Sequence, residues 1–152
     1  MLIKSSLDII PNMIDFNNKT TLKTDESLLN SIAISLSNKE IELIVVDKDE
    51  MKELNKQHRG VDSSTDVLSF SYEDMPNAPL GSIVISSWHV ETKANEFGHT
   101  NDDEMTLLFI HGLLHLLGYD HEVDNGQMRK KEKELIEKFK LPESLIIRTQ
   151  GK

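Results

Sequence analysis

The sequence predicts an α+β fold in which a small mixed sheet of about four strands is covered by about five helices. Segments with the two-residue apolar period of strands are interspersed with segments that have the 3.6-residue period of helices. Nine of the thirteen residues in segment 105–117 are apolar, which predicts a central helix buried on nearly all sides. The 152 residues contain no linker, repeat or low-complexity stretch, so we expect a single domain over residues 1–152.

Four segments are predicted to be strands: 2–10, 40–46, 64–72 and 81–86. The second is the clearest, because Ile41, Leu43 and Val45 alternate along it. Segment 11–21 is polar and rich in asparagine, so it is predicted to be a loop. The tail that follows Pro142 is predicted to fray.

Five segments are predicted to be helices: 25–37, 47–58, 86–97, 101–117 and 124–139. Thr24 is the expected N-cap of the first. Asp47 and Glu50 form a capping pair at the start of the second, and Asn101 and Glu104 do so for the central helix.

The amino-acid composition limits which partners the protein is expected to bind and in which cellular compartment it is expected. A net charge of −9 argues against loose, non-specific binding to nucleic acid, so any RNA contact requires a local patch and no DNA partner is expected. The chain has no cysteine, which excludes disulfides and thiolate metal sites and fits a reducing cytoplasm. We find no apolar run long enough to span a membrane and no secretion signal, so a cytoplasmic protein is expected.

Three histidines in segment 107–121 have the spacing of metal ligands. His111 and His115 are four residues apart, so on a helix they project from one face and can share an ion. Gly118 can end the helix in a left-handed conformation, which allows His121 to return toward the same ion. Three imidazoles leave a fourth position open for water, so one catalytic Zn²⁺ per chain is expected.

Two neighbouring interpretations stay open for this motif. His111 and His115 alone could be core histidines that bond to carbonyl groups, but the third histidine and the glycine favour a metal. The spacing is that of metzincin peptidases, HExxHxxGxxH, although Gly112 stands where their glutamate acts as general base. The motif therefore predicts a metzincin-like zinc site on the central helix that is hydrolytic without being an ordinary peptidase site.

A row of cations is predicted along one face of helix 47–58, at spacings of four, four and three: Lys48, Lys52, Lys56 and Arg59. Such lysines usually form a solvated face. Arg59 differs from them, because the adjacent Gly60 ends the helix and fixes where the guanidinium emerges. The remaining histidines are expected in loops or at the surface: His58, His89 and His99.

The motif HGLLHLLGYDH, residues 111–121, resembles the signature of the YbeY family of bacterial endoribonucleases, also called rRNA maturation factors. Segment 54–70, LNKQHRGVDSSTDVLSF, is similar to that family's LN–x–x–(Y/H)–RG…T(N/D)VLSF block, and segment 81–86 stands where the family has GDIVI. Two departures are Ser82, in place of the usual aspartate, and Ser71, where proline is common.

The resemblance implies a single-strand-specific, metal-dependent endoribonuclease that acts in rRNA maturation, including 16S rRNA 3′ end processing, and in ribosome quality control. It implies zinc at the three histidines, a required arginine at Arg59, and rRNA precursors, the ribosome or ribosomal proteins as partners. Lys48, Lys52 and Lys56 could guide the RNA strand toward Arg59 by their charge. The general base is not identified, since Asp120 and Glu122 beside His121 are as easily structural. The alternatives are a non-enzymatic ribosome-assembly factor with structural zinc and a metallopeptidase.

Overall fold

The computed structural model describes residues 11–72, 77–120 and 124–150. Within them the chain forms the expected α+β architecture, with one four-stranded mixed sheet in the order β1-β2-β4-β3. The strands are β1 (Ile14–Asn18), β2 (Ile41–Val46), β3 (Val67–Ser71) and β4 (Gly81–Ser86). β1, β2 and β4 are parallel to one another, and β3 pairs antiparallel with β4 at the edge.

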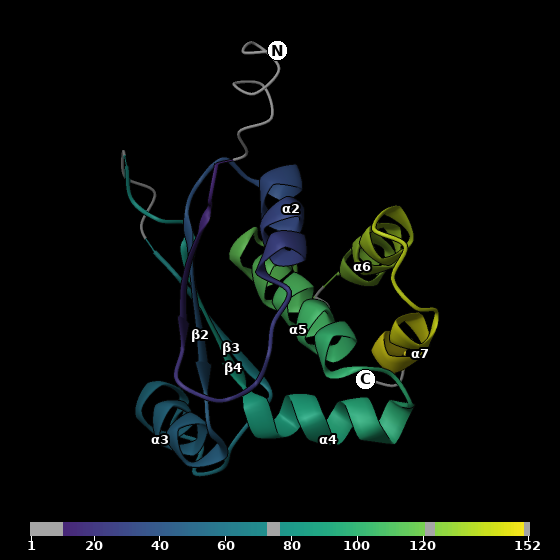
Figure 1. The fold of residues 1–152 in the computed structure, drawn as a ribbon. Coiled ribbons are helices and arrows are strands. Elements are labelled where there is room, and N and C mark those ends of the chain that lie inside the picture. The colour runs from purple at the N-terminus through teal and green to yellow at the C-terminus, as the bar shows by residue number, and fades with distance from the viewer. Residues whose placement is uncertain (1–10, 73–76, 121–123, 151–152) are drawn as a thin grey trace, which may run out of the picture.

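The described residues form six helices: α2 (Glu26–Leu36), α3 (Lys48–Arg59), α4 (Ser87–Phe97), α5 (Asn101–Leu116), α6 (Gln127–Lys138) and α7 (Ser144–Gln150). Figure 1 shows α5 in the middle of the helical layer, between the sheet and α6, with α2 beside it. α3 covers part of the opposite face of the sheet, where Met51 packs with Val46 and Val84. No helix in the described part of the chain has the length and apolar character needed to cross a bilayer.

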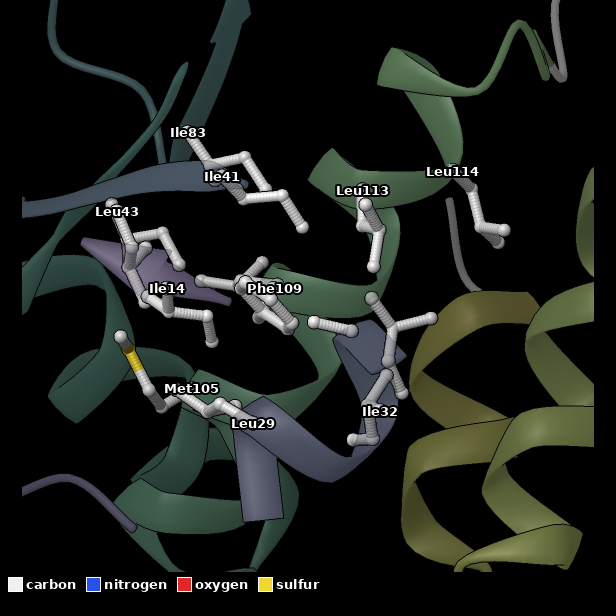
Figure 2. Packing of buried hydrophobic residues seen from close by; sticks show 14 of the residues in the cluster. Ile14, Leu29, Ile32, Ile41, Leu43, Ile83, Met105, Phe109, Leu113 and Leu114 are labelled. Carbon is white, nitrogen blue, oxygen red and sulfur yellow. The ribbon is translucent and has the colours of Figure 1, made fainter. Parts of the chain in front are cut away.

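The core lies between the sheet and α5. Phe109 is fully buried and lies at the centre of the contact, among side chains of β1, β2 and α2 (Figure 2). All residues of α5 from Glu104 to Leu114 are buried, which confirms the prediction of a central helix buried on nearly all sides. Because this helix contacts both the sheet and other helices, apolar residues occupy its whole circumference instead of one stripe.

The first described strand, β1, lies in a segment that the sequence predicted to be a loop. The predicted strand at residues 2–10 lies outside the described residues, and segment 11–21, predicted to be a loop, contains β1. Among the described strands, β1 lies at the edge of the sheet and pairs with β2. One face of β1 is turned toward the core, with Ile14 buried and Phe16 partly buried. Its outward positions are Asp15 and Asn17, and this polar alternation gave the segment the composition of a loop.

Two helix starts differ by one residue from the prediction. Asp25, not Thr24, caps α2, because its carboxylate accepts the backbone N–H of Leu28. Thr100, not Asn101, caps α5 and forms a reciprocal capping box with Asp103. The effective cap is the residue whose side chain reaches the amide three positions on, and adjacent capping candidates make this ambiguous in a sequence.

The tail predicted to fray instead forms α7, which is anchored by buried contacts. Leu145 is fully buried against Leu107 and Ile136. Arg148 is 4% exposed, and its guanidinium lies 3.1 Å from Glu104 Oε2 on α5 and 3.3 Å from Asp66 Oδ2. Pro142 therefore precedes a further helix that a buried ion pair holds against the domain.

Arg148→Ala is expected to lower the free energy of unfolding by about 3 kcal/mol, because it leaves the fully buried Glu104 without its counter-charge. Urea denaturation measures the change. The control is Lys131→Ala, which removes a more exposed 3.6 Å pair with Glu134 and should cost no more than about 0.5 kcal/mol. Equal costs for the two variants would contradict the anchoring role of Arg148.

Candidate functional site

A cleft of about 640 Å³ is formed by the end of α3, by β3 with the residues before it, and by the C-terminal part of α5. Its lining brings together segments that are far apart in the sequence: His58, Arg59, Thr65, Asp66, Val67, Leu68, Ser69, Phe70, Ser71, His111, His115 and Asp120. The cleft thus contains Arg59 and two of the three histidines that the sequence singled out.

The two helical histidines of the motif converge as their spacing predicts. His111 Nε2 and His115 Nε2 are 3.2 Å apart, and both side chains line the cleft. α5 ends just beyond them, and Gly118 has a φ of 99°, which confirms the left-handed turn. The third predicted ligand, His121, lies outside the described residues. The part of the chain that the structure describes contains no group of three metal-ligating side chains.

The donor set of this pair fits zinc. Two ligands of a tetrahedral zinc ion, each about 2.0–2.1 Å from the metal, are about 3.3 Å apart, close to the 3.2 Å between the two Nε2 atoms. His111 Nδ1 lies 3.2 Å from a carboxylate oxygen of Glu132 on α6. With Nδ1–H donating to that carboxylate, Nε2 of His111 carries no proton, which is the form of the imidazole that binds a metal.

Glu132 is a candidate site residue that the sequence analysis missed. It is 3% exposed, and it shares the inward face of α6 with Met128, Leu135 and Ile136. A carboxylate at an otherwise apolar helix position is the available signal, because such a group is rarely buried without a partner.

Gly112 lies where α5 makes its closest approach to the sheet. Its carbonyl oxygen accepts a hydrogen bond from Ser69 Oγ at 3.1 Å. A Cβ at this position would lie 2.8 Å from Cγ2 of Ile83 and 3.1 Å from Ser69 Oγ. Position 112 therefore has no room for the glutamate of the peptidase motif unless the sheet moves away from the helix.

Gly60 ends α3 beside Arg59 as the sequence predicted, and Arg59 lines the cleft. Asp47 caps α3 by accepting the N–H of Glu50 at 2.8 Å, and Gly60 ends the helix with a φ of 71°. Arg59 is exposed at that end. Among the described residues no carboxylate lies within 4 Å of its guanidinium. The local geometry thus presents to the cleft a cation that no described carboxylate neutralises.

The lysines of the α3 row do not line the cleft, although all of them are exposed: Lys48, Lys52 and Lys56. Lys52 Nζ is 3.9 Å from an oxygen of Asp62, and Lys48 Nζ is 3.9 Å from the centre of the Trp88 ring. The row therefore leads away from Arg59 along the outside of α3.

The other three histidines were expected in loops or at the surface, and His58 is exposed while His99 lies in the loop between α4 and α5. His58 lines the cleft, with its ring centre 4.8 Å from that of Phe70. The side chain of His99, predicted to lie in a loop or at the surface, is only 2% exposed and bonds Glu104 at 2.8 Å. Burial lowers the pKa of His89, and the Asp66 carboxylate acts against this shift.

Ser82, the departure from the family aspartate, lies away from the histidines. Neighbouring Ile83 faces α5, so Ser82 faces the other side of the sheet. There the hydroxyl of Tyr72 bonds to Glu42, which raises the pKa of Tyr72, and a bond with Ser82 acts in the opposite direction. Ser82 is not among the residues that line the cleft.

The family model described as Endoribonuclease YbeY matches residues 10–140. A Sulfurimonas denitrificans protein named Endoribonuclease YbeY is 63% identical over 139 residues, which cover 91% of this chain and 100% of that protein. A Campylobacter jejuni protein of the same name is 57% identical, with coverage of 80% and 90%. A solution structure of a Thermotoga maritima protein has 29% sequence identity and a TM-score of 0.56, over 91% of this chain and 93% of that one.

Gly112→Ala is expected to lower the free energy of unfolding by about 1–3 kcal/mol, because its methyl group overpacks a fully buried contact with Ile83. The usual helix-propensity gain of about 1 kcal/mol for this substitution works against the loss. The exposed helical variant Ser31→Ala, followed by the same urea titration, controls for propensity. A Gly112→Ala protein more stable than the parent would show that α5 and the sheet are less tightly packed than described.

Proposed function

We propose a function from one premise: this chain belongs to the endoribonuclease YbeY family. It is a hydrolase that cuts RNA internally and acts in rRNA processing. The observation that carries the proposal is the shared cleft, which is lined by a converging histidine pair and by an arginine that has no ion-pair partner among the described residues. Hydrolysis of a phosphodiester needs both elements: a cation that binds the phosphate oxygens and a site that supplies the hydrolytic chemistry.

In this proposal His111, His115 and His121 hold one zinc ion. The ion, when bound, lowers the pKa of a water and withdraws charge from a phosphate oxygen. Glu132 fixes the tautomer and the ring orientation of His111 through the 3.2 Å contact to Nδ1. The support for this ligand set is the convergence of the two Nε2 atoms and the buried carboxylate behind them.

Arg59 binds the phosphate in this mechanism. Its planar guanidinium can donate two parallel hydrogen bonds to phosphate oxygens, at the position where negative charge increases in the transition state. Its place at the end of α3 keeps the group at the cleft, and the lack of an ion pair within the described residues leaves it available.

The finer assignments follow from the same site. A single strand can present a splayed phosphate and base to a cleft of this size, whereas the bases of a duplex remain stacked inside it. We therefore propose single-stranded regions of rRNA precursors as the substrate, including the 3′ end of 16S rRNA. Ribosomal proteins as partners, ribosome quality control and a cytoplasmic location complete the proposal. The peptidase alternative is disfavoured by the packing around Gly112.

His115→Ala is expected to lose most of the bound zinc, because two remaining imidazoles make a weak site. Metal analysis of protein purified without chelator gives the zinc content per chain. The matched control is His58→Ala, which removes another histidine of the same cleft and should keep the parental metal content. One equivalent of zinc held by His115→Ala at parental affinity would refute the ligand assignment.

Arg59→Glu is expected to slow the cleavage of a single-stranded rRNA fragment by about 100-fold or more, because the transition state loses its cation. Arg59→Lys should also be impaired, since an ammonium cannot make the bidentate contact. Zinc content and melting temperature should stay close to the parental values in both, because Arg59 is exposed and unpaired among the described residues.

The matched charge reversal for this experiment is Lys133→Glu, on the exposed side of α6, which should cut at the parental rate. A folded, zinc-loaded Arg59→Glu protein with the parental rate would exclude the proposed role of Arg59. Wild-type protein that is zinc-loaded and cuts no RNA would favour the assembly-factor alternative.

A further inference from the structure

Trp88 is a large aromatic side chain that the proposed catalytic cleft does not use. It is the one tryptophan of the chain and lies in the first turn of α4. Trp88 is 44% exposed, and it is one of the few large hydrophobic residues with such exposure at the described surface. An indole ring left in solvent at the end of a helix is a candidate contact for a flat ligand.

A cation lies directly on this ring. Lys48, the first residue of α3, places its ammonium nitrogen 3.9 Å from the ring centre of Trp88. Figure 1 shows α3 and α4 meeting at this end of the sheet. Lys48 makes no ion pair with any described residue, so its charge is not neutralised by a carboxylate there.

The Trp88–Lys48 pair lies at one end of the cation row of α3, and Arg59 lies at the other. Lys56 and Arg59 likewise have no ion-pair partner among the described residues. Lys52 has only a 3.9 Å contact with Asp62, and both side chains are more than half exposed. In a protein with a net charge of −9, this leaves one helix face with cations that are little neutralised.

The geometry of the row matches an extended nucleic acid strand. Arg59 is eleven positions after Lys48 in the helix, a rise of about 16 Å, which a few nucleotides of single-stranded RNA can span. Binding sites for single strands combine a track of cations for the phosphates with aromatic rings on which bases stack.

We infer that Trp88 and Lys48 form a remote subsite that stacks a base of single-stranded RNA while another phosphate of the same strand lies at Arg59. The inference rests on the proposed function and adds to it a preference for substrates that extend beyond the cleft. RNA is favoured over a protein partner because the patch is continuous with a cation row that the described carboxylates neutralise little and that ends at the cleft. Because stacking requires no particular base, the subsite favours long single strands over short strands and duplexes, whatever their sequence.

The single tryptophan makes the test direct, because all indole emission of the chain comes from Trp88. The probe is an uncleavable 2′-O-methyl oligouridylate, offered as a trinucleotide, as a nonanucleotide and as a duplex of the longer strand. We expect the nonanucleotide to quench the emission with the same midpoint as its binding, measured by anisotropy of a labelled copy. Emission that stays constant with the nonanucleotide, whether or not it binds, would overturn the inference.

Variants make the test independent of fluorescence. Trp88→Ala should weaken nonanucleotide binding by about five- to 150-fold, the range for one stacked base, and should weaken trinucleotide binding less. Trp88→Phe should restore part of the loss. The control is Ile34→Ala, a similarly exposed apolar side chain on α2, which should bind as the parent does.

Equal binding by Trp88→Ala and the parent would overturn the subsite. Cleavage of an unmodified RNA by the parent protein tests the proposed function separately, so a protein that cuts RNA but shows no role for Trp88 retains the function and loses only the subsite.

Discussion

The close approach of α5 to the sheet is the constraint on which the rest of the site depends. α5 carries the histidine pair on the side that faces the cleft, and at Gly112 its backbone touches β3 and β4. The missing side chain at Gly112 allows the helix to lie close enough for its carbonyl to bond Ser69 on the opposite wall. Because interiors are packed at crystal-like density, a helix held this tightly has little freedom to shift its histidines.

A buried ionic cluster connects the walls of the cleft. The guanidinium of Arg148 forms ion pairs with Glu104, two turns before His111 on α5, and with Asp66, which precedes β3 and lines the cleft. Glu104 is also bonded by His99, so its buried charge has partners on two sides. A buried pair of this kind adds little stability by itself, but it is costly to break, and this restricts how α7, α5 and the β3 wall can move relative to one another.

Whether a feature could be predicted from the sequence depends on how far apart along the chain the interacting residues lie. The convergence of His111 and His115, the end of α3 at Gly60 beside Arg59 and the turn at Gly118 follow from contacts within one or two helical turns. The contacts of Glu132 with His111 and of Asp66 with Arg148 join residues 21 and 82 positions apart, and no local pattern encodes such a pairing. β1 was missed for a related reason, since the exposed Asp15 and Asn17 make the segment polar and its pairing partner, β2, lies 27 positions further along the chain.

The distribution of charge explains how an acidic protein can act on a polyanion. At physiological ionic strength charges are screened beyond about 8 Å, so the net charge of −9 repels nucleic acid only at close range. This repulsion acts over most of the surface. On the α3 face the nearest charges are instead Lys48, Lys56 and Arg59, which have no ion-pair partners among the described residues. The acidic surface repels RNA and the α3 face attracts it, and together they select one binding orientation. Only a strand that lies along α3 toward the cleft is stabilised by the cations. Under this arrangement the low affinity of the general surface is part of the specificity of the site.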